Sequence, residues 1–458
     1  MVSEPLAAAL YARPRRFRPY AEYRKSGVGW LGEIPAHWEV APVYARYDVA
    51  LGKMLDAKRV TGEAPRRYLR NVDVQWDSVN TDGLPEMDFA PGERDRYLLR
   101  PGDLLVCEGG EVGRTAIWRG EIADCFYQKA IHRVRPRSEK DAPRFFYYLM
   151  YSLANRGVFV AGGNPNTIDH LTAVQLRHYR LPFAPRSEQH AIAAFLDPET
   201  AKIDALMAKK QRVVELLQEK RAALITQVVI KGLDPSAPMK DSGTELLAEI
   251  PAHWTVKRLW HLTPADRRIM YGIVLPGPNV DDGVPIVKGG DVSRERLRLE
   301  HLNRTTFEIE SRYVRSRLKG GDLVYAIRGS IGEVEVVPDE LEGANLTQDA
   351  ARVSYTSEYY GNWLLFALRS NQVFAQLEAG ALGATIRGIN IRDLKRALIP
   401  VPPKDEQVEI ANFLTARTAG IEELIRRVAE GIERAREFRS ALITAAVTGK
   451  IDVREEAG

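Results

Sequence analysis

Several features that mark particular protein classes are scarce in this 458-residue chain. Its only cysteines, Cys107 and Cys125, are too few for a disulfide framework or a four-cysteine zinc site, which favours a reducing cytoplasm. No apolar run approaches the ~18 residues of a membrane span. Glycine (35) and proline (26) are near average, which excludes collagen-like and low-complexity chains. The net charge of +4 excludes a histone-like polycation, but clustered basic residues would still suit a nucleic acid.

Signatures of catalysis are also missing. There is no GxxxxGK[ST] phosphate loop, and Asn164-Pro165-Asn166 lacks the second proline and the aromatic ring of an adenine methyltransferase motif. Asp103 and Glu111 resemble half of a metal nuclease set, but no lysine stands two residues after Glu111 and the second copy described below lacks the matching acid. The eight histidines show no metal-ligand spacing. We therefore expect no catalytic centre, no cofactor and no metal in this chain.

The chain is a long internal repeat. Glu33–Trp38 (EIPAHW) recurs unchanged at Glu249–Trp254, and Pro101–Gly113 matches Gly320–Gly332. Pro185–Gly232 matches Pro403–Lys450 with 19 identities in 48 positions. The stretches between the retained blocks share little beyond pattern. The sequence therefore predicts two similar modules, each a variable globular part followed by a constant helical part, which is a usual way to house binding specificity. His37 and His253, each beside a tryptophan, favour a packed His–Trp corner over a ligand role.

The constant parts have the spacing of long helices. Ser187-Glu188-Gln189 can open the first helix, Asp197-Pro198 should interrupt it, and Gly232 and Gly449 should end the two long helices. An a/d stripe over about three heptads predicts a helix seam, with Lys210, Lys220 and Gly431 standing at its gaps. The predicted seam residues are Ile203, Leu206, Val213, Leu217, Leu224, Ile421, Leu424, Val428, Ala435, Phe438 and Leu442. An ordinary amphipathic helix on a globular core is the alternative interpretation.

The variable parts combine strand and helix patterns. Asp103–Cys107, Asp322–Ile327, Tyr68–Val74 and Ile286–Val292 have the character of short strands, and Phe145–Ala154 and Asn362–Ala375 that of helices covering a sheet. The chain should thus divide into five regions: a basic N-terminal arm at 1–24, globular parts at 25–185 and 241–403, and helical regions at 186–240 and 404–458. The fold class is α+β, with two mixed α/β parts joined by long helices.

Basic, aromatic and amide side chains recur at matching places in both modules. Arginine and lysine suit guanine and phosphates, asparagine and glutamine suit adenine, and glycine-rich turns let backbone approach a partner closely. Each residue alone is most simply a surface group, but the recurrence favours DNA contact. The candidate DNA-binding residues are Arg66, Arg67, Tyr68, Arg70, Asn71, Gly110, Arg114, Gln128, Lys129 and Asn166 in the first module, and Lys288, Ser293, Arg294, Arg328, Ser330, Gln348 and Arg387 in the second.

Taken together, the chain resembles the specificity subunits of type I restriction–modification systems. The resemblance rests on the two EIPAHW blocks, the Gly-Asp-Leu strands, the P-x-x-E-Q openings at Pro185 and Pro403, and the helix ends Arg221–Thr226 and Arg439–Thr444. It implies two target recognition domains and two constant helices packed as an antiparallel coiled coil with pseudo-two-fold symmetry. In the second copy Ser330 stands in the turn where the first has Glu111, and Gly431 replaces Val213, which leaves the base code of that half open.

The resemblance also implies partners. These would be double-stranded DNA, two modification subunits that bring S-adenosylmethionine and methylate adenine by base flipping, and restriction subunits that use ATP and Mg²⁺. The expected function is non-catalytic reading of a bipartite, asymmetric DNA target, with the helices setting the spacer. A helical scaffold without DNA readout and a free-standing methyltransferase or nuclease are the alternatives.

Overall fold

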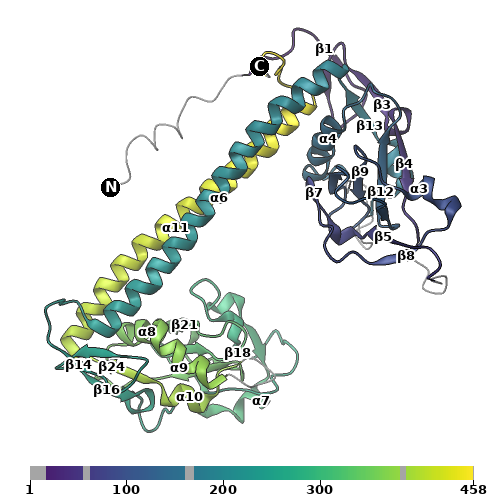
Figure 1. Ribbon diagram of the computed structural model, residues 1–458. Helices are drawn as coiled ribbons and strands as arrows, with labels where there is room; N and C mark the ends of the chain where they lie inside the picture. Colours follow the sequence, from purple (N-terminus) through teal and green to yellow (C-terminus); the bar gives the residue numbers. More distant parts are fainter. Residues whose placement is uncertain (1–16, 55–61, 160–169, 382–387, 457–458) are drawn as a thin grey trace. The chain divides into compact units, whose positions relative to one another are not determined.

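The computed structural model describes residues 17–54, 62–159, 170–381 and 388–456 (Figure 1). The chain forms two compact units, and both long helices contribute to each of them. Unit 1 joins Met1–Lys209 to Gly431–Gly458, and unit 2 holds Lys210–Glu430. Within the described residues, no helix is both long enough and apolar enough to cross a bilayer. Of the predicted basic arm, residues 1–16 lie outside the described part, and Phe17 and Tyr20 pack on unit 1.

The described residues of unit 1 form a four-stranded sheet, a three-stranded sheet and three strand pairs. A four-stranded sheet has the order β10 (Thr115–Ile117), β9 (Leu104–Cys107), β12 (Ile131–Pro136), β4 (Tyr47–Leu51). A three-stranded sheet has the order β11 (Phe126–Tyr127), β5 (Pro65–Leu69), β8 (Glu86–Asp88). The smaller pairs are β13 (Arg180–Phe183) with β3 (Glu39–Pro42), β1 (Tyr23–Lys25) with β2 (Glu33–Pro35), and β6 (Val74–Gln75) with β7 (Ser78–Val79). The helices are α2 (Val43–Arg46), α3 (Arg94–Tyr97), α4 (Pro143–Asn155), which packs on β10, and α5 (Ala173–His178).

Unit 2 repeats this arrangement. Its four-stranded sheet has the order β17 (Met270–Tyr271), β23 (Ala350–Val353), β20 (Leu323–Ala326), β21 (Val334–Val336). Its three-stranded sheet has the order β19 (Asn303–Thr305), β18 (Val284–Val287), β22 (Asn345–Leu346). The pairs are β16 (Thr255–Arg258) with β24 (Leu398–Val401) and β14 (Met239–Asp241) with β15 (Glu249–Pro251). The helices are α7 (Phe307–Ser311), α8 (Gly361–Arg369), which packs on β21, α9 (Asn371–Ala381) and α10 (Ile391–Arg396).

Three predicted elements differ from those in the structure. The predicted strands at Tyr68–Val74 and Ile286–Val292 are shorter, because β5 and β18 end at Leu69 and Val287 and are followed by the 3-10 turns η2 (Asn71–Asp73) and η5 (Gly289–Asp291). The carboxylates of Asp73 and Asp291 accept the backbone N–H of Arg70 and Lys288, which closes each turn. The single helix predicted at Asn362–Ala375 is two helices, since Ser370 separates α8 from α9.

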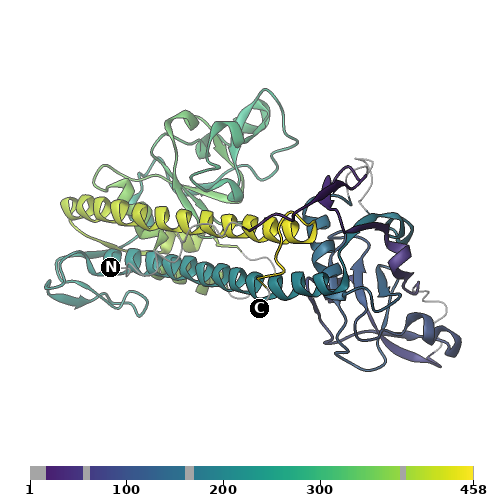
Figure 2. The same cartoon turned by 90° about the horizontal axis from the view of Figure 1, so that it is seen from above.

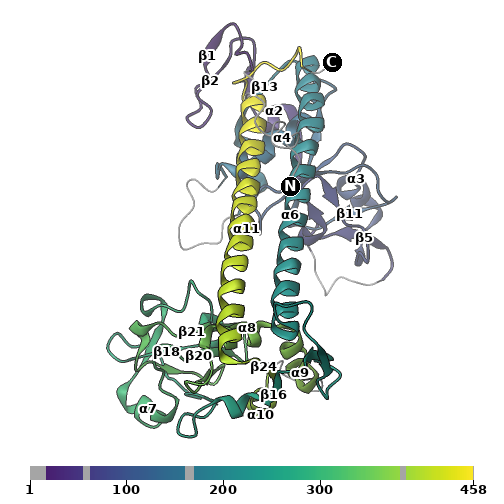
Figure 3. The same ribbon diagram turned by 90° about the vertical axis from the view of Figure 1, so that its left-hand side faces the viewer.

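The two constant parts form α6 (Arg186–Lys231) and α11 (Lys404–Val447), shown in Figures 2 and 3. The predicted interruption at Asp197-Pro198 is wrong, since α6 is continuous over 46 residues with Pro198 inside it. Pro198 removes the hydrogen bond to the carbonyl of Ala194, and both residues are exposed, so water can solvate that carbonyl. Gly232 and Gly449 follow the helix ends with φ of +73° and +68°, and a Cβ on Gly449 would lie 2.3 Å from Pro35 Cδ.

Segments of α6 and α11 lie side by side in each unit, and they are antiparallel. In unit 1 Arg439 on α11 forms an ion pair with Asp204 on α6, 2.8 Å apart. In unit 2 Arg221 on α6 forms an ion pair with Glu422 on α11, 3.1 Å apart. Arg221 comes after Asp204 on α6, whereas its partner Glu422 comes before Arg439 on α11 by the same number of residues. The two helices therefore run in opposite directions, as in an antiparallel coiled coil.

The residues that are buried along these two helices differ in part from the predicted seam residues. Val213, Leu424 and Phe438 are 44%, 50% and 55% exposed, so these three assignments are wrong. Ile421 and Leu442 are buried, and Ile203, Leu206, Leu217, Leu224, Val428 and Ala435 are partly buried. The stripe with alternating steps of four and three runs through Ile203, Met207, Lys210, Val214, Leu217, Arg221, Leu224 and Val228 on α6, and through Leu414, Thr418, Ile421, Ile425, Val428, Ile432, Ala435, Arg439 and Leu442 on α11.

The P-x-x-E-Q openings of the two helices hold the globular parts in place. Gln189 Oε1 accepts the N–H of Ala142 at 2.8 Å and its Nε2 donates to the carbonyl of Ala184 at 2.8 Å, so one side chain ties the start of α4 to the start of α6. Gln407 does the same for α8 and α11, through Tyr360 N and Pro402 O. Each motif is therefore a joint between a globular part and a long helix.

Candidate nucleic-acid interface

Three loops of unit 1 converge at one edge of its sheets. They are Arg70–Asp73 after β5, the glycine turn Gly109–Gly113 after β9, and the segment at Leu171. Asn71 Nδ2 donates to the carbonyl of Gly109 at 2.9 Å, and the Arg114 guanidinium donates to the carbonyl of Asn71 at 2.9 Å. The N–H of Leu171 donates to the carbonyl of Glu108 at 2.8 Å. The sequence-predicted residues Asn71, Gly110 and Arg114 are thus brought together.

The equivalent loops of unit 2 converge in the same way. They are Lys288–Asp291 after β18, the glycine turn Arg328–Gly332 after β20, and the segment at Ile389. The N–H of Ile389 donates to the carbonyl of Ile327 at 2.8 Å. Gly289 packs so closely on the turn that a Cβ there would lie 2.0 Å from the carbonyl oxygen of Arg328. Only glycine permits this approach.

Ser293 and Ser330 meet in a hollow of about 370 Å³ beside this turn. Arg296 and Glu333 also line it. Hydroxyl, guanidinium and carboxylate groups together supply both donors and acceptors, the chemistry needed to distinguish base edges. We call the three loops of each unit its candidate interface.

The cations of the candidate interfaces differ in how far they are already paired. Arg70 is held by Asp73 at 2.8 Å, and this hydrogen bond raises the pKa of Arg70. Arg114 lies 3.5 Å from Glu111, and Arg328 lies 4.0 Å from Asp349, a weak ion pair. Within the described part of the chain, Arg67, Lys129, Lys288 and Arg294 have no ion-pair partner, so they remain available for phosphates.

Some of the predicted contact residues are buried or partly buried in the structure. Tyr68 is wrong as a contact residue: only 6% of it is exposed, and it packs in the core of the three-stranded sheet because its position on β5 points inward. Arg66 lies on β5 opposite Met87 and is partly buried. Gln128 and Gln348 are partly buried after β11 and β22, but they are not equivalent, since Gln128 corresponds to Thr347 and Lys129 to Gln348. Asn166 and Arg387 lie outside the described residues.

The acidic and thiol groups of the site do not form a reactive centre. Asp103 is buried and its carboxylate is held by Arg135 at 2.5 and 2.6 Å, whereas Glu111 accepts the indole N–H of Trp76 at 2.5 Å. The two acids thus have separate structural partners. Burial raises the pKa of Cys107 to about 11 and that of Cys125 to about 12, so both thiols stay protonated at neutral pH. No metal-binding group of three or more histidine, cysteine or acidic residues occurs in the ranges that the structure describes.

Sequence reasoning missed three side chains of the candidate interfaces. Arg296 and Glu333 flank the hollow of unit 2, and their signal was available, since Arg296 belongs to the basic run that begins at Ser293 and Glu333 follows the glycine turn directly. Trp76 orders the turn of unit 1 through Glu111. It lies in a stretch with no counterpart in the other module, so no repeat pointed to it.

Comparisons with known proteins match both modules. A family model described as the type I restriction modification DNA specificity domain matches residues 79–216 and 279–434. The chain is similar to the EcoBI specificity subunit of Escherichia coli, with 25% identity over 362 residues, 78% of this chain and 75% of that protein. It is also similar to the putative MjaX specificity subunit of Methanocaldococcus jannaschii, with 25% identity over 439 residues, 93% of this chain and 96% of that protein.

The fold has a counterpart among solved structures. A chain from a structure that describes complex assembly and conformational transition of the type I restriction–modification system aligns with a TM-score of 0.61 and 17% identity. The alignment covers 90% of this chain and 98% of the other. The shared fold therefore extends over nearly the whole of both molecules.

Proposed function

The chain belongs to the type I restriction modification DNA specificity family, as a specificity subunit with two recognition domains, and we propose that each unit reads one half of a divided DNA target. The observation that carries this proposal is the duplication of the candidate interface. Three loops converge in each unit at equivalent places, between equivalent strands. Such loops on a rigid sheet scaffold are where proteins usually hold their recognition groups.

The target read by the two units is asymmetric. The glycine turn of unit 1 contains Glu111 and is followed by Arg114, whereas that of unit 2 contains Arg328 and Ser330. The loops after β5 and β18 differ as well, with Asn71 at the place of Gly289. Different donors and acceptors select different base edges in the major groove, so the half-targets differ in sequence.

The helices α6 and α11 set the distance between the half-targets. Both run through the two units without a break, over 46 and 44 residues. At 1.5 Å per residue α6 is about 69 Å long. A rod of this kind fixes the number of unread base pairs between two readers, as a ruler would.

The chain works as a non-catalytic member of a complex. The proposed partners are double-stranded DNA, two modification subunits that bring S-adenosylmethionine for adenine methylation, and restriction subunits that use ATP and Mg²⁺, all in the cytoplasm. The sequence lacks the phosphate loop and the methyltransferase motif that these activities need. Apolar side chains outside the seam support docking of modification subunits on the helices: Val213, Leu216, Leu424 and Phe438 are each 44–55% exposed.

Sequencing of methylated adenines tests this function. The chain and its modification subunits are expressed in a host whose DNA carries no adenine methylation, and modified positions are mapped by single-molecule sequencing. We expect one bipartite, asymmetric motif with an unread spacer, absent when the modification subunits are expressed without this chain. A contiguous motif, or the same methylation without the chain, would contradict the proposal.

A further inference from the structure

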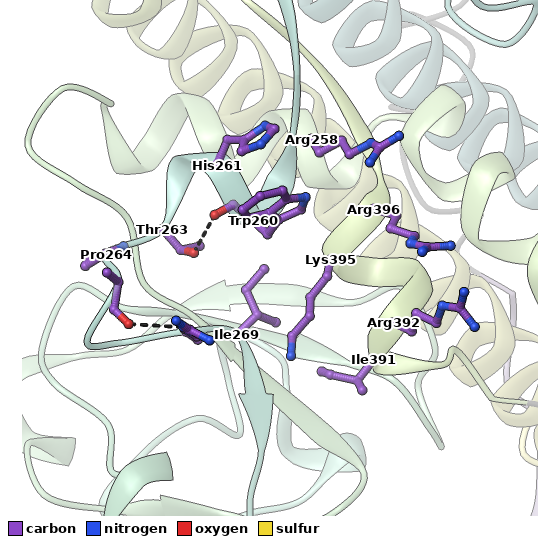
Figure 4. Close-up of a pocket in the computed structure, with 12 residues that line it drawn as sticks. Arg258, Trp260, His261, Thr263, Pro264, Ile269, Ile391, Arg392, Lys395 and Arg396 are labelled. Atoms are coloured by element: carbon purple, nitrogen blue, oxygen red, sulfur yellow. Dashed lines mark hydrogen bonds between the residues drawn. The ribbon is translucent and has the colours of Figure 1, made fainter.

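Unit 2 contains a second hollow, with a volume of about 740 Å³. Its walls come from the turn after β16, the following chain up to β17, and α10. Arg258, Arg392 and Arg396 lie along one wall, and Trp260 stands beside them with Lys395 below (Figure 4). Arg268 also lines the hollow. Five cations thus surround one cavity.

Nothing in the hollow balances these charges. None of its twelve lining residues is acidic, and none of the five cations forms an ion pair with a carboxylate in the described part of the chain. Arg268 Nε donates to the carbonyl of Ala265 at 3.2 Å, which leaves its charge uncompensated. Like charges gathered at a concave surface focus a positive potential, which favours an anionic ligand.

Three of the cations are not required by the fold of the module. The equivalent positions in unit 1 hold Pro42 in place of Arg258, Val174 in place of Arg392 and His178 in place of Arg396, whereas Arg177 keeps a cation in place of Lys395. Unit 1 builds the same strand pair and the same short helix with neutral or weakly basic residues at the first three of these positions. Arg258, Arg392 and Arg396 are therefore specific to unit 2, as expected of a binding site rather than of packing.

The apolar part of the hollow indicates which class of anion it would bind. Trp260 is 48% exposed, and its ring lies against His261 with 3.8 Å between centroids. Ile269 and Ile391 continue this apolar surface. A row of guanidinium groups beside a flat apolar face matches a sugar–phosphate backbone, in which charged oxygens alternate with the C–H surface of the sugar.

The segments that line the hollow lead along the chain into the candidate interface of unit 2. Ile391 begins α10 two residues after Ile389, whose N–H is bonded to the glycine turn. Ile269 leads into β17, and the chain then pairs at Ile273 with Thr347, next to Gln348. The segments that line the hollow therefore continue directly into the loops that would meet bases.

We propose that this hollow binds backbone phosphates of the DNA duplex that flanks the half-target read by unit 2, without reading bases. The inference rests on the proposed function and adds a contact that only one of the two units makes. DNA binding should therefore extend further on the unit 2 side of the target than on the unit 1 side.

The salt dependence of DNA binding tests the proposal, with the full chain assembled with its modification subunits. The double variant Arg392→Gln/Arg396→Gln removes two exposed charges, Arg392→Lys/Arg396→Lys retains them, and Arg315→Gln neutralises an exposed arginine elsewhere in unit 2. We expect the glutamine variant to lower the slope of log K against log salt by about 2, which corresponds to about fivefold weaker binding for each contact at 0.15 M salt. The loss should be equal on target and non-target duplexes, and both controls should bind as the wild type does.

Neutral methylphosphonate linkages in each flank in turn locate the contact. They should weaken binding of the wild type only in the unit 2 flank, and the glutamine variant should not respond to them. Wild-type slope and affinity in the glutamine variant would overturn the inference. So would loss of modification subunits from the complex without a change in DNA affinity, which would mark the hollow as a site for an acidic protein segment. If the wild type itself shows no target preference, the proposed function fails as well.

Discussion

Trp38 and Glu188 are 150 residues apart in the chain, and the indole Nε1 of Trp38 donates to the Glu188 carboxylate at 2.9 Å. The same carboxylate accepts His37 Nε2 at 2.8 Å and the hydroxyl of Tyr20. Unit 2 repeats the contact between Trp254 and Glu406, also at 2.9 Å. The EIPAHW block and the P-x-x-E-Q opening are therefore two halves of one joint, which explains why both recur.

The Trp–Glu hydrogen bond should stabilise unit 1 more than the equivalent hydrogen bond stabilises unit 2. The Glu188 side chain is 4% exposed, whereas that of Glu406 is 36% exposed. Trp38→Phe leaves a buried carboxylate short of a donor and should lower the free energy of unfolding of unit 1 by about 2 kcal/mol. Trp254→Phe should cost unit 2 under about 1 kcal/mol, since water can replace the donor. Hydrogen exchange of peptides from each unit across a urea series measures both, and equal losses would contradict the argument.

Adjacent valines on α6 test the corrected seam. Val214 is 8% exposed and Val213 is 44% exposed. Val214→Asp places a carboxylate against the apolar stripe of α11 and should destabilise the helix pair by about 3 kcal/mol, whereas Val213→Asp should change it by under about 0.5 kcal/mol. Urea denaturation followed by circular dichroism at the helix band compares the two. A larger loss from Val213→Asp would restore the seam that the sequence alone suggested.

The sequence predicts which segments are helices better than which of their faces are buried. The repeat locates both long helices and their glycine ends. The repeat does not show which residue belongs to the buried stripe where two apolar residues are adjacent, as at Val213 and Val214 or Leu216 and Leu217. Arg221 and Arg439 occupy seam positions by packing their aliphatic stems inward and pairing their charges with Glu422 and Asp204. An apolar pattern cannot reveal such residues.

The candidate interface was predictable in its parts but not in its assembly. The glycine turns and the residues after β5 and β18 are visible in the sequence as matched positions. Asn71 meets Gly109 only because the sheets bring the ends of β5 and β9 to one edge. The inward position of Tyr68 follows from the strand register, which a short basic and aromatic run does not fix.

A buried histidine should make unit 1 sensitive to mild acid. His132 is fully buried, its Nε2 lies 2.6 Å from the carbonyl of Leu171, and burial lowers its pKa below the ordinary value of 6.5. The unfolded chain therefore binds a proton that the folded chain rejects, and stability falls as the pH drops below about 6.5, by at most about 1.4 kcal/mol per pH unit.

The variant His132→Gln isolates this effect. Its amide can still donate to Leu171 and does not titrate, so the fall in unfolding free energy between pH 7 and pH 5 should be smaller than in the wild type. Urea titrations at each pH provide the measurement, with exposed His170→Gln as the control. A variant with the same pH profile as the wild type would show that other groups cause the acid loss.

An exposed arginine of the unit 2 turn should read one position of the target. Among the described residues Arg328 pairs only with Asp349, at 4.0 Å, and it lies beside Gly388. Arg328→Gln should lower discrimination at one position of one half-target by about 1–3 kcal/mol and leave the other half unchanged. Mapping of methylated adenines gives the readout, and Arg315→Gln serves as the matched control. Relaxed selectivity in both halves would mean that the two units do not read independently.

The length of the helices should set the spacer. Seven residues inserted after Gln211 on α6 and seven after Gly431 on α11, at facing positions, preserve the heptad register and lengthen the pair by about 10 Å, or roughly three base pairs. The methylation motif should gain about three unread base pairs while both half-targets keep their bases. Insertion into α6 alone shifts the register between the seams of α6 and α11 and should abolish methylation. An unchanged spacer after the paired insertion would show that something other than the rods fixes the distance between the half-targets.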